Sequence, residues 1–314
     1  MSTNNYHFIV NAAASSGAGY RTWKIVEKIL AEESIVYSVY FPKDERETEA
    51  LTRKLTGTSG ENCHLIILGG DGTLNAVLQG IECFEHTVIS CIRTGSGNDF
   101  ARNMHITKDV RKALLHILYH PKEKILDYGE LYLQRDAGDN GDLRRFIISS
   151  GIGYDADICE EVSRSRLKSI MNRIHMGKLV YVLIGIKQIL TRQSGKALIQ
   201  IDDNKPIKVS GMFFTVAMIH PCEGGGVPFC PQADPADGRF DICLVKDMPK
   251  WKLFLAVMLV YIKKHYLLRE VTGYRGQKLT IKTENPEWFH MDGETPCRVR
   301  RLTMECKTGL RIFL

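Results

Sequence analysis

One short segment of this sequence combines glycines with a carboxylate in a way suited to holding a phosphate. In residues 66–77, IILGGDGTLNAV, an apolar run leads into Gly-Gly-Asp-Gly and then into a helix-like pattern that begins near Thr73. Glycines let backbone amides approach an anion without a Cβ in the way, and a helix N-terminus adds partial positive charge. The segment predicts a phosphate-binding turn, with an ordinary strand-to-helix turn as the alternative. It is not a Walker A loop, because no Gly-Lys-Ser/Thr follows the last glycine.

Two other segments repeat this arrangement. Residues 93–103, RTGSGNDFARN, place two glycines before an Asn-Asp pair, and residues 11–21, NAAASSGAGYR, place a serine and two glycines after an apolar run. We expect turns at the carboxyl ends of one parallel sheet to converge on a shared ligand. A carboxylate faces a phosphate usefully only through a cation or a hydroxyl, so Asp71 and Asp99 are assigned to the hydration shell of Mg²⁺ or to a ribose.

The elements that must position these turns follow from the hydrophobic pattern. The first third of the chain alternates strand-like and helix-like segments, which favours a parallel sheet with helices on its faces. From about residue 126 strand-like segments and turn-rich stretches dominate, interrupted by helix-like segments near 160–192 and 250–268. The sequence thus predicts an α/β domain and a second domain of antiparallel β structure. The expected strands lie at 6–10, 35–41, 64–68, 87–92, 124–134, 144–153, 196–202, 207–219, 239–245, 278–283 and 297–307, and the first two helices at 21–33 and 45–55.

Composition narrows the class of protein. A chain of 314 residues favours two domains, and its nine cysteines are odd in number and never form a C-x-x-C pair, which argues against a disulfide scaffold or a zinc site and fits a reducing cytoplasm. The net charge is +6, and residues 162–201 hold eight Lys and Arg and no acid. Such asymmetry indicates an anionic partner, either nucleic acid or membrane.

No segment predicts insertion across a membrane. The N-terminus lacks the pattern of a signal peptide, and the longest apolar run, residues 253–262, is half the roughly 20 residues that span a bilayer. We therefore expect a soluble or surface-bound protein. The basic stretch 162–201 has two equal interpretations, an interfacial helix that meets anionic headgroups or a core helix with solvated lysines. For the segment 249–265, PKWKLFLAVMLVYIKKH, core packing is favoured.

The three glycine-rich segments, in this order, resemble the diacylglycerol kinase catalytic-domain family, which includes bacterial lipid kinases and sphingosine kinases. The family motif Gly-Gly-Asp-Gly-Thr-x-Asn is complete at 69–75, and the block Gly-x-Gly-Asn-Asp-Phe-Ala-Arg is present at 95–102. Further resemblance extends over residues 149–162, 224–241 and 289–294. The NAD kinases share the first of these motifs but not the second. The chain departs from the family at Ala12, Ala14, Phe41 and Arg93, where Pro, Ser, Thr and Pro are common.

The resemblance implies ATP-dependent phosphorylation of a lipid hydroxyl with Mg²⁺ as cofactor. It implies an NAD-kinase-like α/β domain at 1–125, a β-sandwich domain at 126–302 that binds the lipid, and a chain end, 303–314, that returns to the first domain. The nucleotide would lie in the cleft between the domains. Its expected ligands are Asn11, Ser16, Gly17, Gly69, Gly70, Asp71, Gly72, Thr73, Asn75, Gly95, Ser96, Gly97, Asn98 and Asp99.

The resemblance also assigns the catalytic and metal-binding residues. In the segment MDGE, Asp292 and Glu294 are two residues apart, so on a strand both carboxylates would face the same way. One of them would be the base, with Asp292 favoured, and the other would assist through metal or hydrogen bonding. A plain hairpin turn is the alternative interpretation of this Asp-Gly pair. A structural Mg²⁺ site is expected at Asp234, Asp237 and the carbonyl of Arg239.

The expected partners are ATP and a lipid at the membrane surface rather than nucleic acid. A diacylglycerol-like lipid is favoured, while sphingoid bases, phosphatidylglycerol and polyprenols stay open. The location would be cytoplasmic with peripheral membrane association, and a homodimer is a common default. The ten histidines show no metal-ligand spacing and are interpreted as structural or surface residues. The alternatives are an NAD-kinase-like enzyme and a non-enzymatic lipid or nucleotide binder, the second suggested by the departures from the family and opposed by the retained acids.

Overall fold

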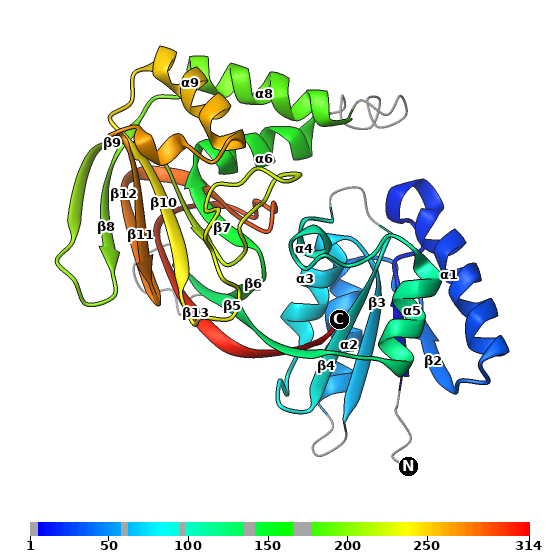
Figure 1. The fold of residues 1–314 in the computed structure, drawn as a ribbon. Coiled ribbons are helices and arrows are strands. Elements are labelled where there is room, and N and C mark those ends of the chain that lie inside the picture. The colour runs from blue at the N-terminus through cyan, green and yellow to red at the C-terminus, as the bar shows by residue number, and fades with distance from the viewer. Residues whose placement is uncertain (1–5, 58–61, 95–97, 135–141, 166–176) are drawn as a thin grey trace. The chain divides into compact units, whose positions relative to one another are not determined.

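The chain folds into two compact units (Figure 1). The computed structural model describes residues 6–57, 62–94, 98–134, 142–165 and 177–314. Unit 1 comprises the chain up to Tyr128, Gly224–Gly226 and Thr308–Leu314, and unit 2 comprises Gly129–Glu223 and Val227–Lys307. The sequence pattern places the first boundary at 125/126, whereas the units divide inside one continuous strand, where composition does not change.

The sheet of unit 1 is built from parallel strands. They are β1 (Tyr6–Val10), β2 (Tyr37–Tyr40), β3 (Cys63–Gly69) and β4 (Thr87–Arg93), in the order β2-β1-β3-β4. The end of β13 (Arg298–Phe313) pairs in parallel with β4 at Arg311 and Ile312. Every residue of β1 is buried, as expected of a parallel strand whose two faces are both covered.

Five helices accompany this sheet in the described part of unit 1. They are α1 (Ala14–Glu32), α2 (Glu45–Thr56), α3 (Asp71–Gly80), α4 (Asp99–Asn103) and α5 (Val110–Tyr119). Helices α1 and α5 pack on β1, β3 and β4 through a core that includes Phe8, Trp23, Leu30, Leu114 and Ile117. This packing fixes the carboxyl ends of β1, β3 and β4, where the predicted turns begin.

Unit 2 is dominated by antiparallel strands. The long strands β9 (Ile207–Met218) and β12 (Lys278–Met291) are both paired with β7 (Ser149–Gly153) at one end and with β8 (Gly195–Ile201) at the other. Strands β10 (Phe240–Lys246) and β11 (Val271–Gly276) extend from β9, while β13 extends from β12 and pairs with β5 (Glu123–Gln134), which pairs with β6 (Asp142–Phe146). Phe146, Phe240 and Phe289 are completely buried in the core that these strands enclose.

The helices of unit 2 gather on one side of its strands (Figure 1). They are α6 (Tyr154–Arg164), α8 (Gly177–Thr191), α9 (Lys250–Tyr261) and the 3-10 turn η1 (His265–Leu267). The single helix predicted at 160–192 corresponds to two helices, α6 and α8, in the structure. Residues 166–176 of the basic stretch lie outside the described residues.

The prediction that segment 249–265 packs in the core is wrong for most of its length. Only Leu253 and Val260 of α9 are buried, while Trp251 and Met258 are each 70% exposed. The apolar pattern is uniform around α9, so it does not reveal which face is covered. No helix in the described part of the chain is both long enough and apolar enough to cross a membrane.

Candidate functional site

The first predicted turn is the start of a helix. Helix α1 begins at Ala14, so Ser16 and Gly17 lie in its first turns and not in a loop. A Cβ on Gly19 would overlap the carbonyl oxygen of Asn11, so only glycine lets α1 start this close to the end of β1. The sequence pattern placed the helix start at residue 21 because the small residues before it have no helical periodicity.

Asn11 connects the first turn to the second. Its Nδ2 donates to Thr73 Oγ1 at 3.0 Å, and its backbone amide donates to Leu68 O. Thr73 therefore lies in the first turns of α3 and does not begin the helix, which starts at Asp71 after the N-cap residue Gly70. Asn75 is buried one turn further along α3. Of the predicted ligands in this segment, Gly70 to Thr73 surround the helix N-terminus.

Gly69 occupies a position where no larger residue fits. A Cβ on Gly69 would lie 2.5 Å from Cβ and Oγ1 of Thr73. The absence of a side chain therefore keeps the strand end and the helix start in contact. This is the close approach that a phosphate-binding turn requires.

Asp71 joins the second turn to the third. Its Oδ2 accepts the backbone N–H of Asp99 at 2.9 Å and its Oδ1 accepts that of Phe100 at 3.1 Å. The carboxylate thus caps the amino end of α4 from a different segment of the chain. The structure brings Asp71 and Asp99 together, with Asp71 bonded to backbone amides.

Asp99 is itself engaged on both oxygens. Its Oδ2 accepts the backbone N–H of Gly225 at 2.7 Å, and its Oδ1 forms an ion pair with the guanidinium of Arg102. Asn98 before it has φ of +52°, a left-handed conformation that asparagine tolerates. Three further predicted ligands, Gly95, Ser96 and Gly97, lie outside the described residues.

A small pocket lies between the second and third turns of unit 1. Its lining includes Gly69, Gly70 and Asp71 from one turn and Arg93 and Asn98 from the other. We name the set Asn11, Gly69–Thr73 and Asn98–Phe100 the glycine-turn site. The site offers backbone amides at the start of α3 and polar side chains at the mouth of a parallel sheet.

The predicted catalytic pair in unit 2 does not alternate along a strand. Asp292 and Gly293 have φ of +49° and +89°, and Met291 and Glu294 exchange backbone hydrogen bonds, each 2.9 Å long. These features define a type I′ turn between β12 and β13. The expectation that both carboxylates face one side of a strand is therefore wrong, because the Asp-Gly pair reverses the chain.

The carboxylate of Asp292 holds another segment in place. Its Oδ2 accepts the amide of Ile147 at 2.9 Å, and its Oδ1 accepts those of Ile148 at 2.8 Å and Ser149 at 3.1 Å. The amide of Asp292 in turn donates to Ser149 O at 2.9 Å. Asp292 thus binds the start of β7 through four hydrogen bonds, whereas Glu294 lies half-buried beyond the turn.

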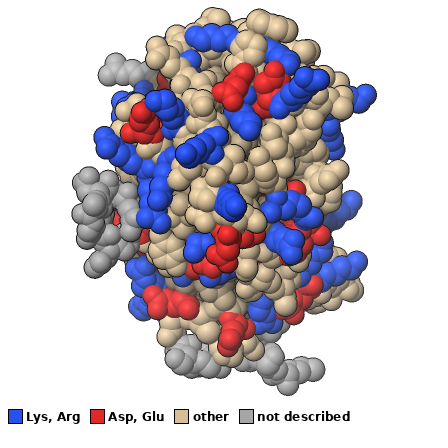
Figure 2. Space-filling view, turned by 90° about the vertical axis from the view of Figure 1, so that its left-hand side faces the viewer, with Lys and Arg blue, Asp and Glu red and all other residues tan. Residues whose placement is uncertain are grey.

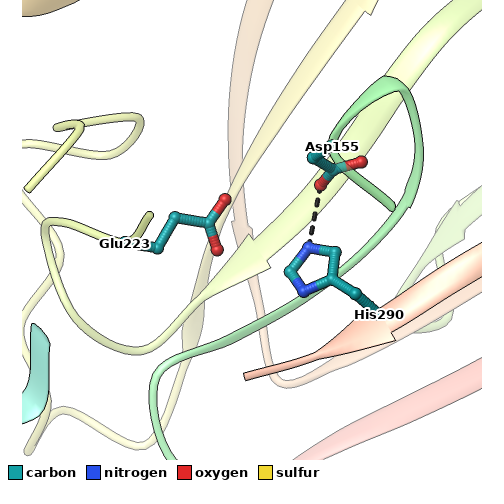
Figure 3. A group of neighbouring side chains, drawn as sticks. All are labelled: Asp155, Glu223 and His290. Atoms are coloured by element: carbon teal, nitrogen blue, oxygen red, sulfur yellow. Dashed lines mark hydrogen bonds and ion pairs between the residues drawn. The ribbon is translucent and has the colours of Figure 1, made fainter. Parts of the chain in front are cut away.

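Three titratable side chains cluster beside this turn (Figure 3). Asp155, Glu223 and His290 are all buried, and one ligand-type atom from each lies within 4.8 Å of the others. His290 Nε2 and Asp155 Oδ2 are 3.0 Å apart, and Glu223 also accepts a hydrogen bond from Ser149 Oγ. Among the described residues this is the one group of three acid or histidine ligands close enough to share a metal ion.

The electrostatics of this cluster favour a charged histidine. Burial opposes the imidazolium, but the carboxylate of Asp155, with smaller effects from Glu223 and Asp292, raises the pKa of His290 to about 9. His290 is therefore protonated at neutral pH and neutralises part of the negative charge. Gly151 leaves room for the pair, since a Cβ there would overlap Asp155 and lie 2.8 Å from His290 Nε2.

The two carboxylates of the expected Mg²⁺ site differ in their contacts. Asp237 accepts the backbone N–H of Arg239 at 3.1 Å with one oxygen and pairs with the guanidinium of Arg275 with the other. Asp234 accepts the amide of Ala236 at 3.1 Å in the same turn. The guanidinium of Arg275 thus supplies positive charge at Asp237, and the Mg²⁺ site stays a prediction. We derive no step of the reaction through that site.

Sequence reasoning missed several of these residues. Asp155 and His290 lie inside segments that carry the family resemblance, but their roles were not assigned, and Glu223 and Arg102 were not singled out. The available signal was the alternation along β12, which places His290 two residues before Asp292. Glu223 gives no local signal, because its partners are more than sixty residues away in the chain.

Comparison with known proteins identifies the family. Residues 5–130 match the diacylglycerol kinase catalytic domain, and residues 148–310 match the YegS C-terminal NAD kinase beta sandwich-like domain. The chain belongs to the diacylglycerol kinase catalytic-domain family. The second match confirms the predicted β-sandwich character of the C-terminal region, and the first confirms the resemblance drawn from the glycine-rich motifs.

Individual members of this kinase family resemble the chain over most of its length. It is 26% identical over 302 residues to "Putative lipid kinase YtlR" of Bacillus subtilis, covering 94% of this chain and 96% of that protein. It is 24% identical to a diacylglycerol kinase of Mycobacterium tuberculosis, covering 74% and 71%. A solved structure described as a diacylglycerol kinase from Bacillus anthracis superposes with a TM-score of 0.68 at 16% identity, covering 99% and 97%, and shows the shared fold.

Proposed function

We propose that this member of the family is an ATP-dependent lipid kinase that transfers the γ-phosphate to the hydroxyl of a diacylglycerol-like lipid. The observation that carries the proposal is the glycine-turn site, in which Asp71 draws two family motifs together around one helix N-terminus. The names of the relatives support a lipid acceptor. The proposed setting is the surface of a membrane on its cytoplasmic side.

The glycine-turn site suits ATP phosphates for a steric reason. Gly69 lets the end of β3 pack directly against Thr73, so that the start of α3, whose amides favour an anion, directly follows the end of the strand. Mg²⁺ would be held mainly by the phosphates and water, with Asp71 and Asp99 close to its hydration shell, and it would neutralise charge on the transferred group. The protein's own contribution is to position these groups.

We assign the proton acceptor to Glu294. An alcohol must lose its proton as it attacks phosphorus, and a suitably placed carboxylate can take it. Both oxygens of Asp292 already accept backbone N–H groups of the β7 segment, which suits a residue that fixes the turn. This reverses the sequence-based preference for Asp292 as the base and gives Asp292 a positioning role.

The lipid acceptor is the least specified part of the proposal. Apolar pockets discriminate weakly between acyl chains, by about 1–3 kcal/mol per methylene. Diacylglycerol is favoured because several relatives carry that name.

The test is phosphate transfer from γ-labelled ATP. Diacylglycerol, a sphingoid base, phosphatidylglycerol, a polyprenol and NAD would each be offered in mixed micelles, with ATP binding measured in parallel by calorimetry. We expect transfer to diacylglycerol and little to NAD. ATP binding without transfer to any lipid would contradict the proposal and favour a non-enzymatic nucleotide binder, and transfer to NAD would favour the NAD-kinase alternative.

A further inference from the structure

The helical side of unit 2 exposes an unusual amount of apolar surface. Of the twenty-one large hydrophobic side chains that are exposed among the described residues, thirteen lie between residues 182 and 267. We name this set the α8–α9 face. Its members are Val182, Leu183, Ile186, Leu190, Trp251, Phe254, Leu255, Val257, Met258, Tyr261, Ile262, Tyr266 and Leu267.

Folding of unit 2 does not account for this surface. Helix α9 already has a buried stripe, formed by Leu253 and Val260 with Ala256 partly buried between them. Helix α8 buries Val180, Ile184 and Ile189 against its neighbours. The exposed apolar residues are additional to these stripes, and a concentration of exposed apolar side chains on two neighbouring helices marks an interaction site.

The charges around the α8–α9 face are mainly positive, although Glu161 pairs with Lys187 of α8. Helices α8 and α9 contain no Asp or Glu, and Lys250 and Lys252 begin α9 while Lys263 and Lys264 follow it. Glu270 pairs with Lys252, and Lys263 and Lys264 are exposed. Figure 2 views the molecule from the left-hand side of Figure 1, and on that side Lys and Arg cover more of the surface than Asp and Glu.

Trp251 and Tyr261 lie at the two ends of α9. Trp251 is 70% exposed next to Lys250 and Lys252, and Tyr261 is 59% exposed two residues before Lys263. Trp and Tyr are enriched at the boundary between acyl chains and headgroups, where lysine can reach anionic phosphates. Apolar side chains between such ends match an interfacial helix, which lies in the membrane surface without crossing it.

We propose that the α8–α9 face docks on an anionic lipid bilayer, with the apolar side chains of α9 entering the acyl boundary and the flanking lysines contacting headgroups. A second copy of the chain would also cover apolar surface, but flanking lysines on both copies would repel. The proposal rests on the proposed function, since a lipid kinase must reach a substrate held in a membrane. The docking proposal adds which surface of the protein contacts the membrane.

The protein carries its own probe for this contact. Of its three tryptophans, Trp23 is buried in unit 1 and Trp288 lies under the guanidiniums of Arg164 and Arg298, so a Trp288→Phe variant leaves Trp251 as the exposed one. Vesicles of phosphatidylcholine with one quarter phosphatidylglycerol, without ATP, would be titrated in. We expect a blue shift of the emission, quenching by brominated acyl chains, and weaker binding as NaCl is raised.

Matched variants locate the contact. Met258→Glu places a charge on the α8–α9 face, and we expect it to weaken vesicle binding by about tenfold or more. Val36→Glu, at a position 88% exposed in unit 1, is the control and should change binding less than twofold. Thermal unfolding of each variant shows whether it is folded, and the Trp251 quenching experiment needs no change on the face itself.

The outcomes separate docking from catalysis. Vesicle binding without phosphate transfer would overturn the proposed function but leave the docking face standing. Phosphate transfer to short-chain lipid in micelles, with no quenching of Trp251 by vesicles, would overturn the docking face alone. Equal effects of the two variants would also overturn it, as would light scattering that shows Met258→Glu converting a dimer into a monomer.

Discussion

Each unit contains an Asp-Gly turn whose carboxylate binds backbone from a distant segment. In unit 1 the carboxylate of Asp71 accepts two amides at the start of α4, and in unit 2 that of Asp292 accepts three amides near the start of β7. The chain continues differently after each turn. Asp71 leads into helix α3, whose first residues help to line the pocket, whereas Asp292 and Gly293 reverse the chain and are followed by Glu294.

This comparison shows how the same dipeptide can prepare a site for different groups. The helix start in unit 1 leaves N–H donors that suit an anion. The reversal in unit 2 is followed by Glu294, to which we assign the proposed role of proton acceptor. In both units the aspartate of the Asp-Gly pair holds a distant backbone segment through hydrogen bonds. The residues that follow the pair differ in their chemistry.

The strongest test of the comparison separates Glu294 from Asp292. We expect Glu294→Gln to lower kcat by about 10²–10⁴ in a protein that still folds, because the amide cannot accept the proton of the attacking hydroxyl. Asp292→Asn should lower both activity and stability, because an amide group accepts the three N–H groups less well. Steady-state kinetics and thermal unfolding of both variants provide the measurement. A fully active Glu294→Gln enzyme would show that the assignment of the base is wrong.

The turn in unit 2 should also make stability depend on pH. The pKa of His290 is raised to about 9 in the folded protein, above the ordinary value near 6.5. Its contribution to the free energy of unfolding is fully present below about pH 6.5 and is lost as pH rises through 9, and it amounts to roughly 3–4 kcal/mol. We expect His290→Gln to remove most of this slope. Urea unfolding between pH 6 and 9.5 measures it, and equal slopes in both proteins would contradict the charged cluster.

Substitution of Asp71 should lower stability for the same reason as substitution of Asp292, but by a smaller amount. Asp71→Ala leaves the amides of Asp99 and Phe100 without their acceptor, at a cost of about 1–3 kcal/mol. The Km for ATP should rise, because the two glycine turns are no longer held together. Urea unfolding and ATP titration test this, with Lys54→Ala at an exposed position of α2 as a control. Unchanged ATP affinity would separate Asp71 from the nucleotide site.

The smallest effect concerns the glycine of the turn in unit 2. Gly293 has φ of +89° and nothing within 4 Å of a built Cβ, so Gly293→Ala adds backbone strain and no clash. We expect a loss of about 1 kcal/mol, and a smaller loss for Gly293→Asn. Urea midpoints of the two variants give the comparison. A loss of several kcal/mol for alanine would mean that the turn makes contacts beyond its backbone geometry.

The sequence predicted those elements of the fold that a short run of apolar residues marks by itself. Apolar runs bounded by glycines correspond to β1, β3 and β4, and the strand-rich region corresponds to unit 2. The start of α1 at Ala14 was missed because it depends on the close approach of Gly19 to Asn11. Strand β11 was missed as well, since its residues Val271–Gly276 alternate between apolar and polar too weakly to stand out.

The site was predictable as a set of motifs but not as a set of contacts. Motif spacing selected Asp71, Asp99 and Asp292, but which atoms their carboxylates bind depends on segments 28 or more residues away. The prediction that Asp292 and Glu294 face the same side of a strand was wrong, because Asp292 adopts a positive φ and begins a turn. The prediction that α9 packs in the core was wrong for most of the helix. Its residues are apolar on all sides, so the sequence does not indicate which side is buried.

The composition of unit 1 has a consequence for folding during synthesis. Its sheet includes the last residues of the chain, which pair with β4, and its Asp99 accepts the amide of Gly225. A ribosome that has made the first 128 residues has therefore not yet released all the parts of this unit. We expect the amino-terminal unit to complete its hydrogen bonding only after the carboxyl end emerges, so the order of synthesis and the order of folding differ in this chain.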